Sequence, residues 1–179
     1  MAKINGIELK ALKSFLDHEG APCMQGNVYY KGKKLGFWSQ DSWGGCDIMD
    51  FDASILQPEV LRFQAGYPDT YKYKTLLDDP SMLFYEILTL KELEKQVKKG
   101  IKAGFQVFVS LLTDWEITTF FVKKDDTDEN ILKLCEQQIQ AHLDRHKTRN
   151  HVIHIFRSLN GLNLTIDEDH PAPDYLMRK

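Results

Sequence analysis

The sequence predicts an α+β protein in which a small antiparallel β unit is followed by a sandwich of four strands and two helices. From Ser81 to Leu159, runs rich in β-branched and aromatic residues alternate with two amphipathic helical patterns, in the order strand, helix, strand, strand, helix, strand. Before that point, short apolar runs are separated by glycines, as in antiparallel hairpins. The order βαββαβ is that of a ferredoxin-like sandwich, a fold that enzymes, nucleic-acid binders and regulatory modules share.

The N-terminal β unit is predicted to span residues 1–57. Lys31 and Gly32 provide a hairpin-length connection between two of its strands. An alternative interpretation makes Leu9–Leu16 a helix, because its apolar residues recur at helical spacing. The predicted strands are Ile7–Leu9, Asn27–Tyr30, Leu35–Ser39 and Ile48–Phe51.

A helical and loop connection is predicted over residues 58–80, with a short helix at Glu59–Gln64. The ferredoxin-like domain is predicted to cover 81–160, and a C-terminal tail covers 161–179. The sequence contains no internal repeat and no long linker, so the parts are expected to pack together.

Two helices are predicted in the ferredoxin-like domain from their capping residues and apolar stripes. Thr89 and Glu92 have the spacing of a capping box, so the first helix is expected to begin near Leu90 and to end at Gly104. Asp126 is expected to cap the second helix. The apolar stripes are Leu90, Leu93, Val97 and Ile101 on the first helix and Leu132, Cys135, Ile139 and Leu143 on the second.

The four strands of this domain are predicted at Met82–Leu88, Phe105–Leu112, Trp115–Val122 and Val152–Phe156. Thr113 and Asp114 would connect the middle two strands. Both faces of these strands are apolar, whereas two helices on one side of an antiparallel sheet cover only one face. The other face is therefore expected to be covered by the N-terminal segment or, through self-association, by a second copy of the chain.

Composition excludes several classes of protein. The formal net charge of −3 over 179 residues argues against a strongly basic nucleic-acid binder. The three cysteines, Cys23, Cys46 and Cys135, lack a metal-type pair spacing and suit reduced thiols in the cytoplasm. No apolar run approaches the about 20 residues that span a bilayer, and the N-terminus lacks the apolar region of a signal peptide. We therefore expect a cytoplasmic protein with no membrane partner, and no motif predicts a cofactor.

One resemblance lies in the stretch Gly26-Asn27-Val28-Tyr29-Tyr30-Lys31-Gly32-Lys33-Lys34-Leu35-Gly36-Phe37-Trp38, which continues through Asp41 to Gly44-Gly45-Cys46. It resembles a pattern found in small uncharacterised proteins of bacterial phages and mobile elements. The resemblance covers the first third of the chain. It implies a bacterial or phage origin and assigns no activity.

Two groups of residues could hold a metal ion, and they form the alternative prediction of a metal-dependent hydrolase. Asp50 and Asp52 share one face of an extended segment. The run 50–54 also looks like the DxDx[TS] motif of haloacid-dehalogenase-type phosphotransferases, although the parallel α/β pattern of that family is missing. His142 and His146 lie one helical turn apart on the second helix. They also continue its apolar stripe, so the competing interpretation places them at the edge of the core.

Nucleic-acid binding through one helix face is a second alternative. An RNA-recognition sheet would carry an aromatic pattern on its third strand, and this pattern is absent from Trp115–Val122. Solvation and the helix dipole already explain lysines near a helix C-terminus. The lysines in question are Lys95, Lys98, Lys99 and Lys102.

The loop around Trp43 is the preferred place for a binding function. It combines tryptophan with polar groups beside a glycine-rich turn, which is typical of recognition surfaces. Burial of a tryptophan in a small core is the competing interpretation. The candidate binding residues are Trp38, Asp41, Trp43, Cys46 and Asp47.

The sequence as a whole predicts a bacterial or phage accessory protein that acts as a non-enzymatic protein-interaction module.

Overall fold

The structure is a computed structural model that describes residues 1–113, 116–146 and 151–177. Within these residues, nine strands in two sheets and three α-helices confirm the predicted α+β class. No described helix combines the length and the apolar content that crossing a lipid bilayer requires.

The chain divides into two compact units, and each is built from separate stretches of sequence. The large-sheet unit combines Ala2–Leu88 with Leu164–Pro171. The small-sheet unit combines Thr89–Asn163 with Met1 and Ala172–Lys179.

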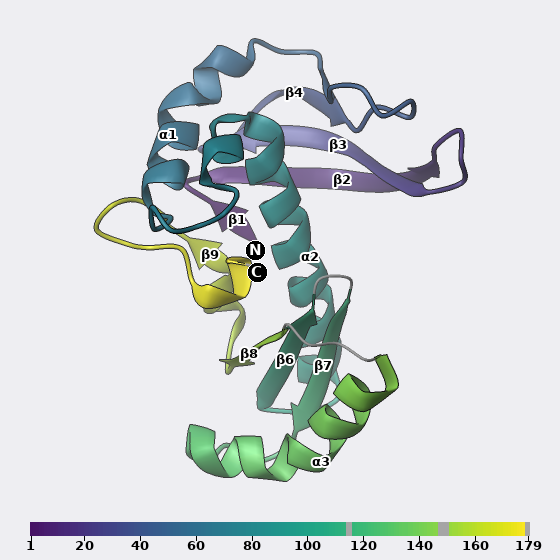
Figure 1. The fold of residues 1–179 in the computed structure, drawn as a ribbon, viewed down its shortest axis with the longest axis vertical. Coiled ribbons are helices and arrows are strands. Elements are labelled where there is room, and N and C mark those ends of the chain that lie inside the picture. Colours follow the sequence, from purple (N-terminus) through teal and green to yellow (C-terminus); the bar gives the residue numbers. More distant parts are fainter. Residues whose placement is uncertain (114–115, 147–150, 178–179) are drawn as a thin grey trace. The chain divides into compact units, whose positions relative to one another are not determined.

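The sheet of the large-sheet unit contains β1 (Lys3–Ile4), β2 (Ile7–Leu16), β3 (Pro22–Tyr30), β4 (Lys33–Ser39), β5 (Ile48–Met49) and β9 (Asn163–Leu164). Its strand order is β5-β4-β3-β2-β1-β9, and the successive pairs from β1 to β5 are antiparallel. The three long strands lie side by side in Figure 1. Lys31 and Gly32, with φ of 48° and 82°, close the tight turn between β3 and β4. The four strands that the sequence predicts in this region are confirmed.

The helical interpretation of Leu9–Leu16 is wrong, because this segment belongs to β2. A bulge shifts the register between Lys10 and Lys13, and Ala11 adopts a φ of 51° there. The extra residue interrupts the two-residue alternation of the strand. The resulting three- and four-residue intervals between leucines imitate the spacing of a helix.

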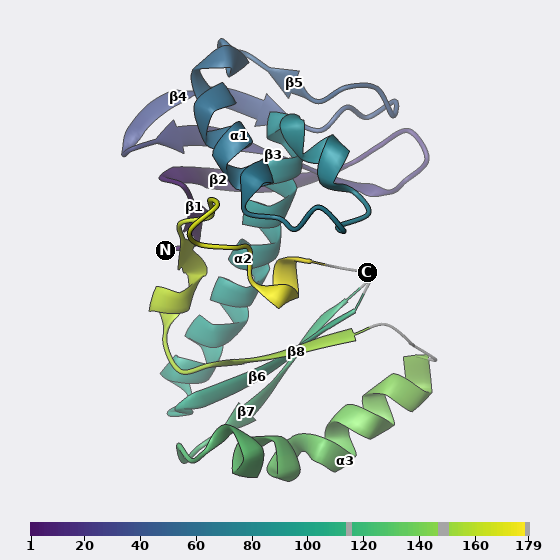
Figure 2. The same ribbon diagram turned by 60° about the vertical axis from the view of Figure 1, so that its left-hand side comes forward.

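Two helices cover one face of the large sheet, as the rotated view in Figure 2 shows. The first is α1 (Gln57–Ala65), which confirms the short helix predicted between the domains. The second is the beginning of α2 (Pro80–Lys102). On the sheet, Tyr30 Oη donates to Glu59 Oε1 of α1 at 2.7 Å, and the buried Trp38 ring packs edge-on against Phe84 of α2 at 5.5 Å.

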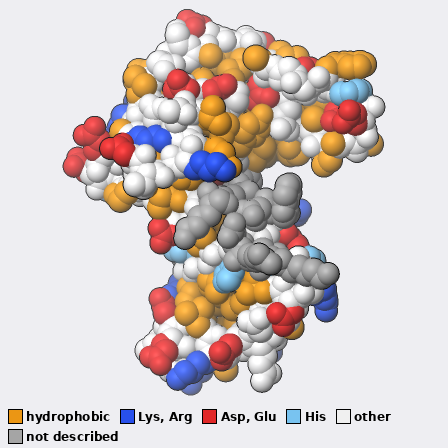
Figure 3. Space-filling model, in the orientation of Figure 1, with side chains coloured by type: hydrophobic (Ala, Val, Ile, Leu, Met, Phe, Trp, Pro, Cys, Tyr) orange, Lys and Arg blue, Asp and Glu red, His pale blue; other side chains and the backbone are white. Residues whose placement is uncertain are grey.

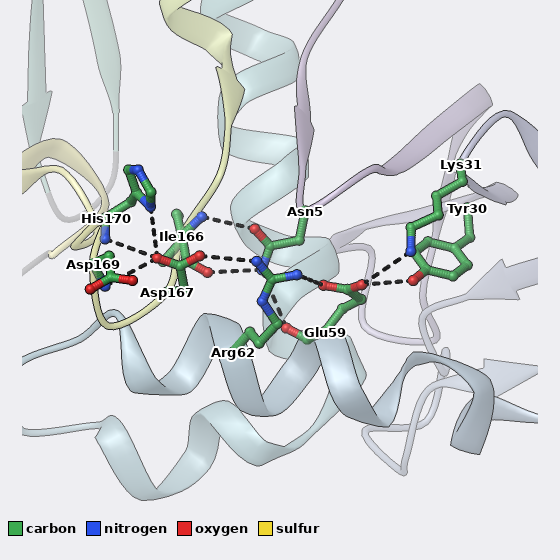
Figure 4. A network of polar contacts seen from close by, with 9 residues as sticks. All are labelled: Asn5, Tyr30, Lys31, Glu59, Arg62, Ile166, Asp167, Asp169 and His170. Carbon is green, nitrogen blue, oxygen red and sulfur yellow. Dashed lines mark hydrogen bonds and ion pairs between the residues drawn. The ribbon is translucent and has the colours of Figure 1, made fainter.

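The segment Leu164–Pro171 returns to this unit and is bound by the polar network drawn in Figure 4. Asn5 Nδ2 donates to the carbonyl oxygen of Ile166 at 2.9 Å, and Asn5 Oδ1 accepts from the Ile166 N–H at 2.8 Å. Asn5 is 8% exposed and has a φ of 49°, a conformation that asparagine tolerates better than most residues. The Asn5 side chain thus makes both hydrogen bonds to the Ile166 backbone that a neighbouring strand would otherwise make.

Arg62 extends the network by joining two carboxylates. Its Nη1 donates to Glu59 Oε2 at 3.1 Å, and its Nη2 donates to Asp167 Oδ2 at 3.0 Å. Hydrogen bonds from His170 and Arg62 lower the pKa of Asp167 to about 2. Glu59 is 5% exposed, so its charge is compensated inside the unit, as a buried carboxylate requires.

The predicted strand Met82–Leu88 is wrong, because these residues belong to the 23-residue helix α2. The helix begins at Asp79-Pro80-Ser81, where Asp79 Oδ1 accepts from the Ser81 N–H at 2.8 Å. Methionine, leucine and glutamate in this segment are good helix formers, and Thr89 with Glu92 lies inside the helix rather than at its start. The completely buried side chains follow one helical stripe: Leu83, Phe84, Ile87, Leu90, Leu93 and Val97.

The small-sheet unit contains three strands, β6 (Val107–Thr113), β7 (Ile117–Val122) and β8 (His151–Phe156). Their order is β7-β6-β8, and β6 is antiparallel to both neighbours. These strands confirm three of the four predicted in this region. A ferredoxin-like arrangement is not confirmed, because its first strand is helical. Asp114, in the predicted connection, lies outside the described residues.

The two predicted helices lie on opposite faces of this sheet and not on the same one. The helix α3 (Asp128–His146) packs against Val107, Val109 and Leu111 on one face. The last turns of α2 cover the other face, where Gly100 contacts the rings of Phe108 and Phe121. Figure 2 shows the sheet between them. The apolar character of both strand faces therefore has an explanation within one chain.

The helix predicted after Asp126 is confirmed as α3, with small changes in its cap and its buried stripe. Thr127 precedes it and accepts from the Asn130 N–H through Oγ1 at 3.4 Å, while Asp126 accepts from the Thr127 N–H at 2.7 Å. Ile131 replaces Leu132 in the buried stripe, since Leu132 is 37% exposed.

Gly104, with a φ of 81°, ends α2 as predicted. Short 3₁₀ helices lie at Ala53–Leu56, Lys74–Asp78, Leu159–Leu162 and Asp174–Leu176.

Candidate metal centre

The candidate site lies where the β6–β7 hairpin meets the last turns of α3. Glu116 comes just before β7, and Thr113 at the end of β6 holds its backbone. The Thr113 N–H donates to Glu116 O at 2.9 Å, and the Glu116 N–H donates to Thr113 Oγ1 at 3.1 Å. Residues 118, 120 and 122 pair with the β6 residues that face α3. Strand alternation therefore directs the Glu116 side chain toward the same helix.

His142 and His146 are one turn apart on the face of α3 that packs on the sheet. They follow Cys135 and Ile139 along the buried stripe, so the packing of this stripe places them over the end of the hairpin. Their rings are stacked, with centroids 4.4 Å apart and an interplanar angle of 23°. The i, i+4 spacing therefore gives two imidazoles on one side, as the sequence predicts.

Glu116 Oε2 lies between the two imidazoles. It is 3.7 Å from His142 Nε2 and 3.8 Å from His146 Nδ1. Each of the three residues offers one ligand atom, and these atoms all lie within 4.8 Å of one another. Within 1–113, 116–146 and 151–177, no other group of three or more histidine, cysteine or acidic side chains meets that condition.

The polar atoms around this group leave one nitrogen unsatisfied. The His142 side chain is 13% exposed, and its Nε2 is buried without a hydrogen-bond partner among the described residues. Thr118 Oγ1 donates to Glu116 Oε1 at 3.2 Å, so the carboxylate is oriented with Oε2 toward the imidazoles. A buried polar atom without a partner is costly, and an ion at this point would bind it.

Two imidazoles and one carboxylate form the donor set of many zinc sites. A tetrahedral zinc ion with bonds of about 2.0–2.2 Å holds its ligand atoms roughly 3.3–3.5 Å apart. The separations between the carboxylate and the two ring nitrogens exceed this range by a few tenths of an ångström. Small side-chain rotations would close that difference. The residues present therefore fit a zinc-class ion.

Asp50 and Asp52 are not brought together with histidine, and each has a local partner. Asp50 Oδ1 accepts from the Phe37 N–H next to the edge strand β5. Asp52 begins a 3₁₀ helix by accepting from the Ser54 N–H at 3.0 Å. Hydrogen bonds from Ser54 lower the pKa of Asp52. Both side chains therefore accept hydrogen bonds from the backbone of their own region of the chain.

The predicted binding residues around Trp43 separate into buried and exposed members. Trp38 is completely buried, and its Nε1 donates to Asp47 Oδ2 at 2.7 Å. Tyr85 Oη donates to the other oxygen of Asp47 at 3.0 Å. Trp38 and Asp47 are therefore part of the packing between β4 and α2.

The remaining members lie at the surface. Trp43 is 75% exposed, and Cys46 is an exposed free thiol. Asp41 Oδ2 accepts from the Gly45 N–H at 2.6 Å and shapes the loop between them. Cys135 is buried in the α3 stripe, as the sequence predicts.

The four lysines of the nucleic-acid alternative line a groove of about 460 Å³ on α2, together with Lys91 and Glu94. Glu94 is 4% exposed and pairs with Lys91 at 3.4 Å and with Lys98 at 2.7 Å. Lys95 pairs with Glu92 at 3.4 Å. Acidic residues on the same helix therefore neutralise part of the positive charge.

Sequence reasoning found the two histidines but missed Glu116. The histidines share a helix, so their spacing alone places them together. Glu116 arrives from a different element, and its place depends on the packing of α3 against the hairpin. A scan against protein-family models, a search of curated proteins and a search of solved structures found no match to this chain.

Proposed function

We propose that this protein binds one zinc-class metal ion through His142 Nε2, His146 Nδ1 and a Glu116 carboxylate oxygen. The observation that carries the proposal is the convergence of these three donors around a buried imidazole nitrogen that has no hydrogen-bond partner. Glu116 binds through Oε2, because Thr118 occupies Oε1. This contact is the outer-shell support that metal-binding side chains usually have.

The donor set selects the class of ion. Imidazole nitrogen suits zinc, copper, nickel and iron, whereas calcium and magnesium prefer oxygen donors. Zinc tolerates a mixed nitrogen and oxygen set in tetrahedral geometry. Three protein ligands would leave a fourth position for water or a small ligand, which is the arrangement of hydrolytic zinc sites. Metal binding is thus the first condition for the predicted hydrolase alternative.

The test is a titration of the purified, chelator-treated protein with zinc chloride, followed by calorimetry and thermal unfolding. We expect one zinc ion per chain. At a free zinc concentration about 100 times the dissociation constant, the free energy of unfolding should rise by about 2.7 kcal/mol. Cobalt chloride provides a second readout, because its visible absorption spectrum reports four-coordinate geometry.

Three ligand variants and two further variants make this titration specific. His142→Ala, His146→Ala and Glu116→Gln should each abolish the stoichiometric site. Thr118→Val should keep it with about 10–100-fold weaker affinity, the usual effect of losing an outer-shell contact. His170→Ala, which removes a 66% exposed histidine in the other unit, should bind like the wild type. Unchanged zinc affinity in the three ligand variants would refute the proposal, and circular dichroism checks that each variant is folded.

A further inference from the structure

A second feature, independent of the metal site, lies at the end of the β2–β3 hairpin. We call it the Trp43 tip, and it consists of Leu16, Asp17, His18, Glu19, Asp41 and Trp43. Figure 3, in the orientation of Figure 1, shows hydrophobic, histidine and acidic side chains next to one another at this end of the hairpin. None of these residues takes part in the metal site or in the core of the large-sheet unit.

Backbone contacts give the tip a defined shape. Asp17 Oδ1 accepts from the N–H groups of Glu19 and Ala21 at 2.8 and 2.7 Å, which closes the hairpin turn. The His18 ring lies 2.6 Å from Ser42 O through Nδ1, so the hairpin is tied to the loop that carries Trp43. A surface held in this way loses little conformational entropy when it binds a partner.

Trp43 is presented to solvent on this support. Its ring stacks on His18 with centroids 4.6 Å apart and an interplanar angle of 15°. One ring face is therefore in contact with histidine, and with the side chain 75% exposed the opposite face remains open. Leu16 is also 69% exposed. Two large apolar side chains at one exposed tip are typical of interaction sites.

The tip that carries Trp43 contains three acidic side chains, Asp17, Glu19 and Asp41. Glu19 Oε1 lies close to Nε2 of the His18 ring that stacks on Trp43, and Asp41 Oδ2 accepts from the N–H of Gly45, two residues beyond Trp43. Among the described residues, Asp17 and Asp41 form no ion pair with lysine or arginine, and Glu19 pairs only with His18, at 3.6 Å. The exposed tryptophan therefore lies in a tip whose acidic groups have no lysine or arginine partner among the described residues.

We infer that the Trp43 tip is a docking surface for an arginine-rich segment of a partner protein. A guanidinium group can stack on the open face of the indole ring and donate to a neighbouring carboxylate at the same time. Lysine stacks less well on an indole ring, because its ammonium group is compact and strongly hydrated. The acidic groups of the tip repel nucleic-acid phosphates, so a basic protein segment is the occupant that charge complementarity selects.

The first experiment measures binding of a fluorescein-labelled Arg-Gly-Arg-Gly-Arg-Gly peptide by fluorescence anisotropy at several salt concentrations. The wild type should bind this peptide more tightly than the matching lysine peptide, and it should not bind the matching glutamate peptide. Tryptophan emission should change during the titration of the wild type, and the change should be absent in Trp43→Ala, which separates Trp43 from the other two tryptophans of the chain. Equal binding of the arginine and lysine peptides would overturn the stacking arrangement.

Variants then separate the tip from general attraction of opposite charges. Trp43→Ala should weaken binding of the arginine peptide at least about fivefold, and Trp43→Phe should retain part of the affinity. The double variant Asp17→Asn with Asp41→Asn should weaken binding and reduce its salt dependence, while the amide oxygens can still accept the turn hydrogen bonds. Glu168→Gln removes one exposed charge of the same unit elsewhere and should change nothing.

Two outcomes would overturn the inference. One is equal affinity of the wild type and Trp43→Ala for the arginine peptide. The other is a concentration-dependent dimer in sedimentation experiments that disappears in Trp43→Ala, because the tip would then bind a second copy of this chain. Zinc affinity should be unchanged in every tip variant, so failure of this inference leaves the metal proposal intact.

Discussion

His154 illustrates how burial determines the behaviour of a single residue in the small-sheet unit. Its ring lies 4.5 Å from the rings of Phe156 and Tyr175, measured between centroids. Burial lowers the pKa of His154, and the carboxylates of Asp128 and Asp174 oppose the shift. The neutral imidazole is therefore the form that the folded state prefers.

The pKa shift of His154 predicts a stability change in the histidine pH range. Because the folded-state pKa lies below the unfolded value, the unfolded chain binds more protons as the pH falls below about 6.5. The stabilisation is fully present above that pH and is lost as the pH falls toward the folded-state pKa. In urea unfolding between pH 8 and 5, the wild type should lose stability relative to His154→Gln on acidification. A difference that stays constant, or that grows in favour of the wild type at low pH, would contradict this.

Residue spacing revealed two of the three ligands of the metal centre. His142 and His146 lie on one helix, where a four-residue interval places two side chains on the same side. Glu116 belongs to a hairpin that comes earlier in the chain, and no local rule connects it with α3. Trp38 and Trp43 are close in sequence but differ in burial, since Trp38 packs against a helix and Trp43 lies in an exposed loop.

At the scale of elements, α2 shows which local sequence signals determine where a helix begins and how far it extends. The helix starts at Asp79 and Pro80, with Asp79 as the capping residue. Thr89 and Glu92 have the spacing of a capping box, but they lie inside the helix. The aromatic residues in Met82–Leu88 favoured a strand in isolation. Their buried stripe continues without interruption into Leu90 and Leu93, and this continuity is the stronger indication of one helix.

The start of α2 gives a prediction about stability. Asp79→Ala should lower the free energy of unfolding by about 0.5–2 kcal/mol, because the Ser81 N–H loses its capping acceptor. Chemical denaturation measures the change. The control is Asp78→Ala, an exposed neighbour of the same charge with no capping contact among the described residues. Equal effects of the two substitutions would show that charge, and not capping, is responsible.

At the scale of the whole molecule, the chain returns to a unit that it has already built. The segment Leu164–Pro171 belongs to the large-sheet unit, although Thr89–Asn163 lies between the two parts in sequence. Asn5 and Arg62 supply the contacts that bind this segment, and both lie far from it along the chain. Closing so long a loop costs entropy, which the contacts at its end must offset.

Asn5 is expected to be the most sensitive point of this closure. Asn5→Ala leaves the buried N–H and C=O groups of Ile166 without partners and should destabilise the protein by about 1–3 kcal/mol. Urea unfolding measures the loss, and limited proteolysis should show faster cleavage within Leu164–Pro171. Asn160→Ala, at an exposed position whose side chain makes no described contact, is the matched control. Unchanged proteolysis in Asn5→Ala would contradict the role of this side chain.

The sequence by itself determined the α+β class, the hairpin strands of the large sheet, three strands of the small sheet and the apolar stripe of α3 except for its first residue, because these follow from local spacing and turn chemistry. Only the tertiary structure decided that Met82–Leu88 extends α2, that the two helices take opposite faces of the small sheet, and that Glu116 meets the two histidines. Each of these depends on which apolar surfaces pack together. That choice minimises exposed apolar area over the whole chain, so a local window of sequence does not contain it.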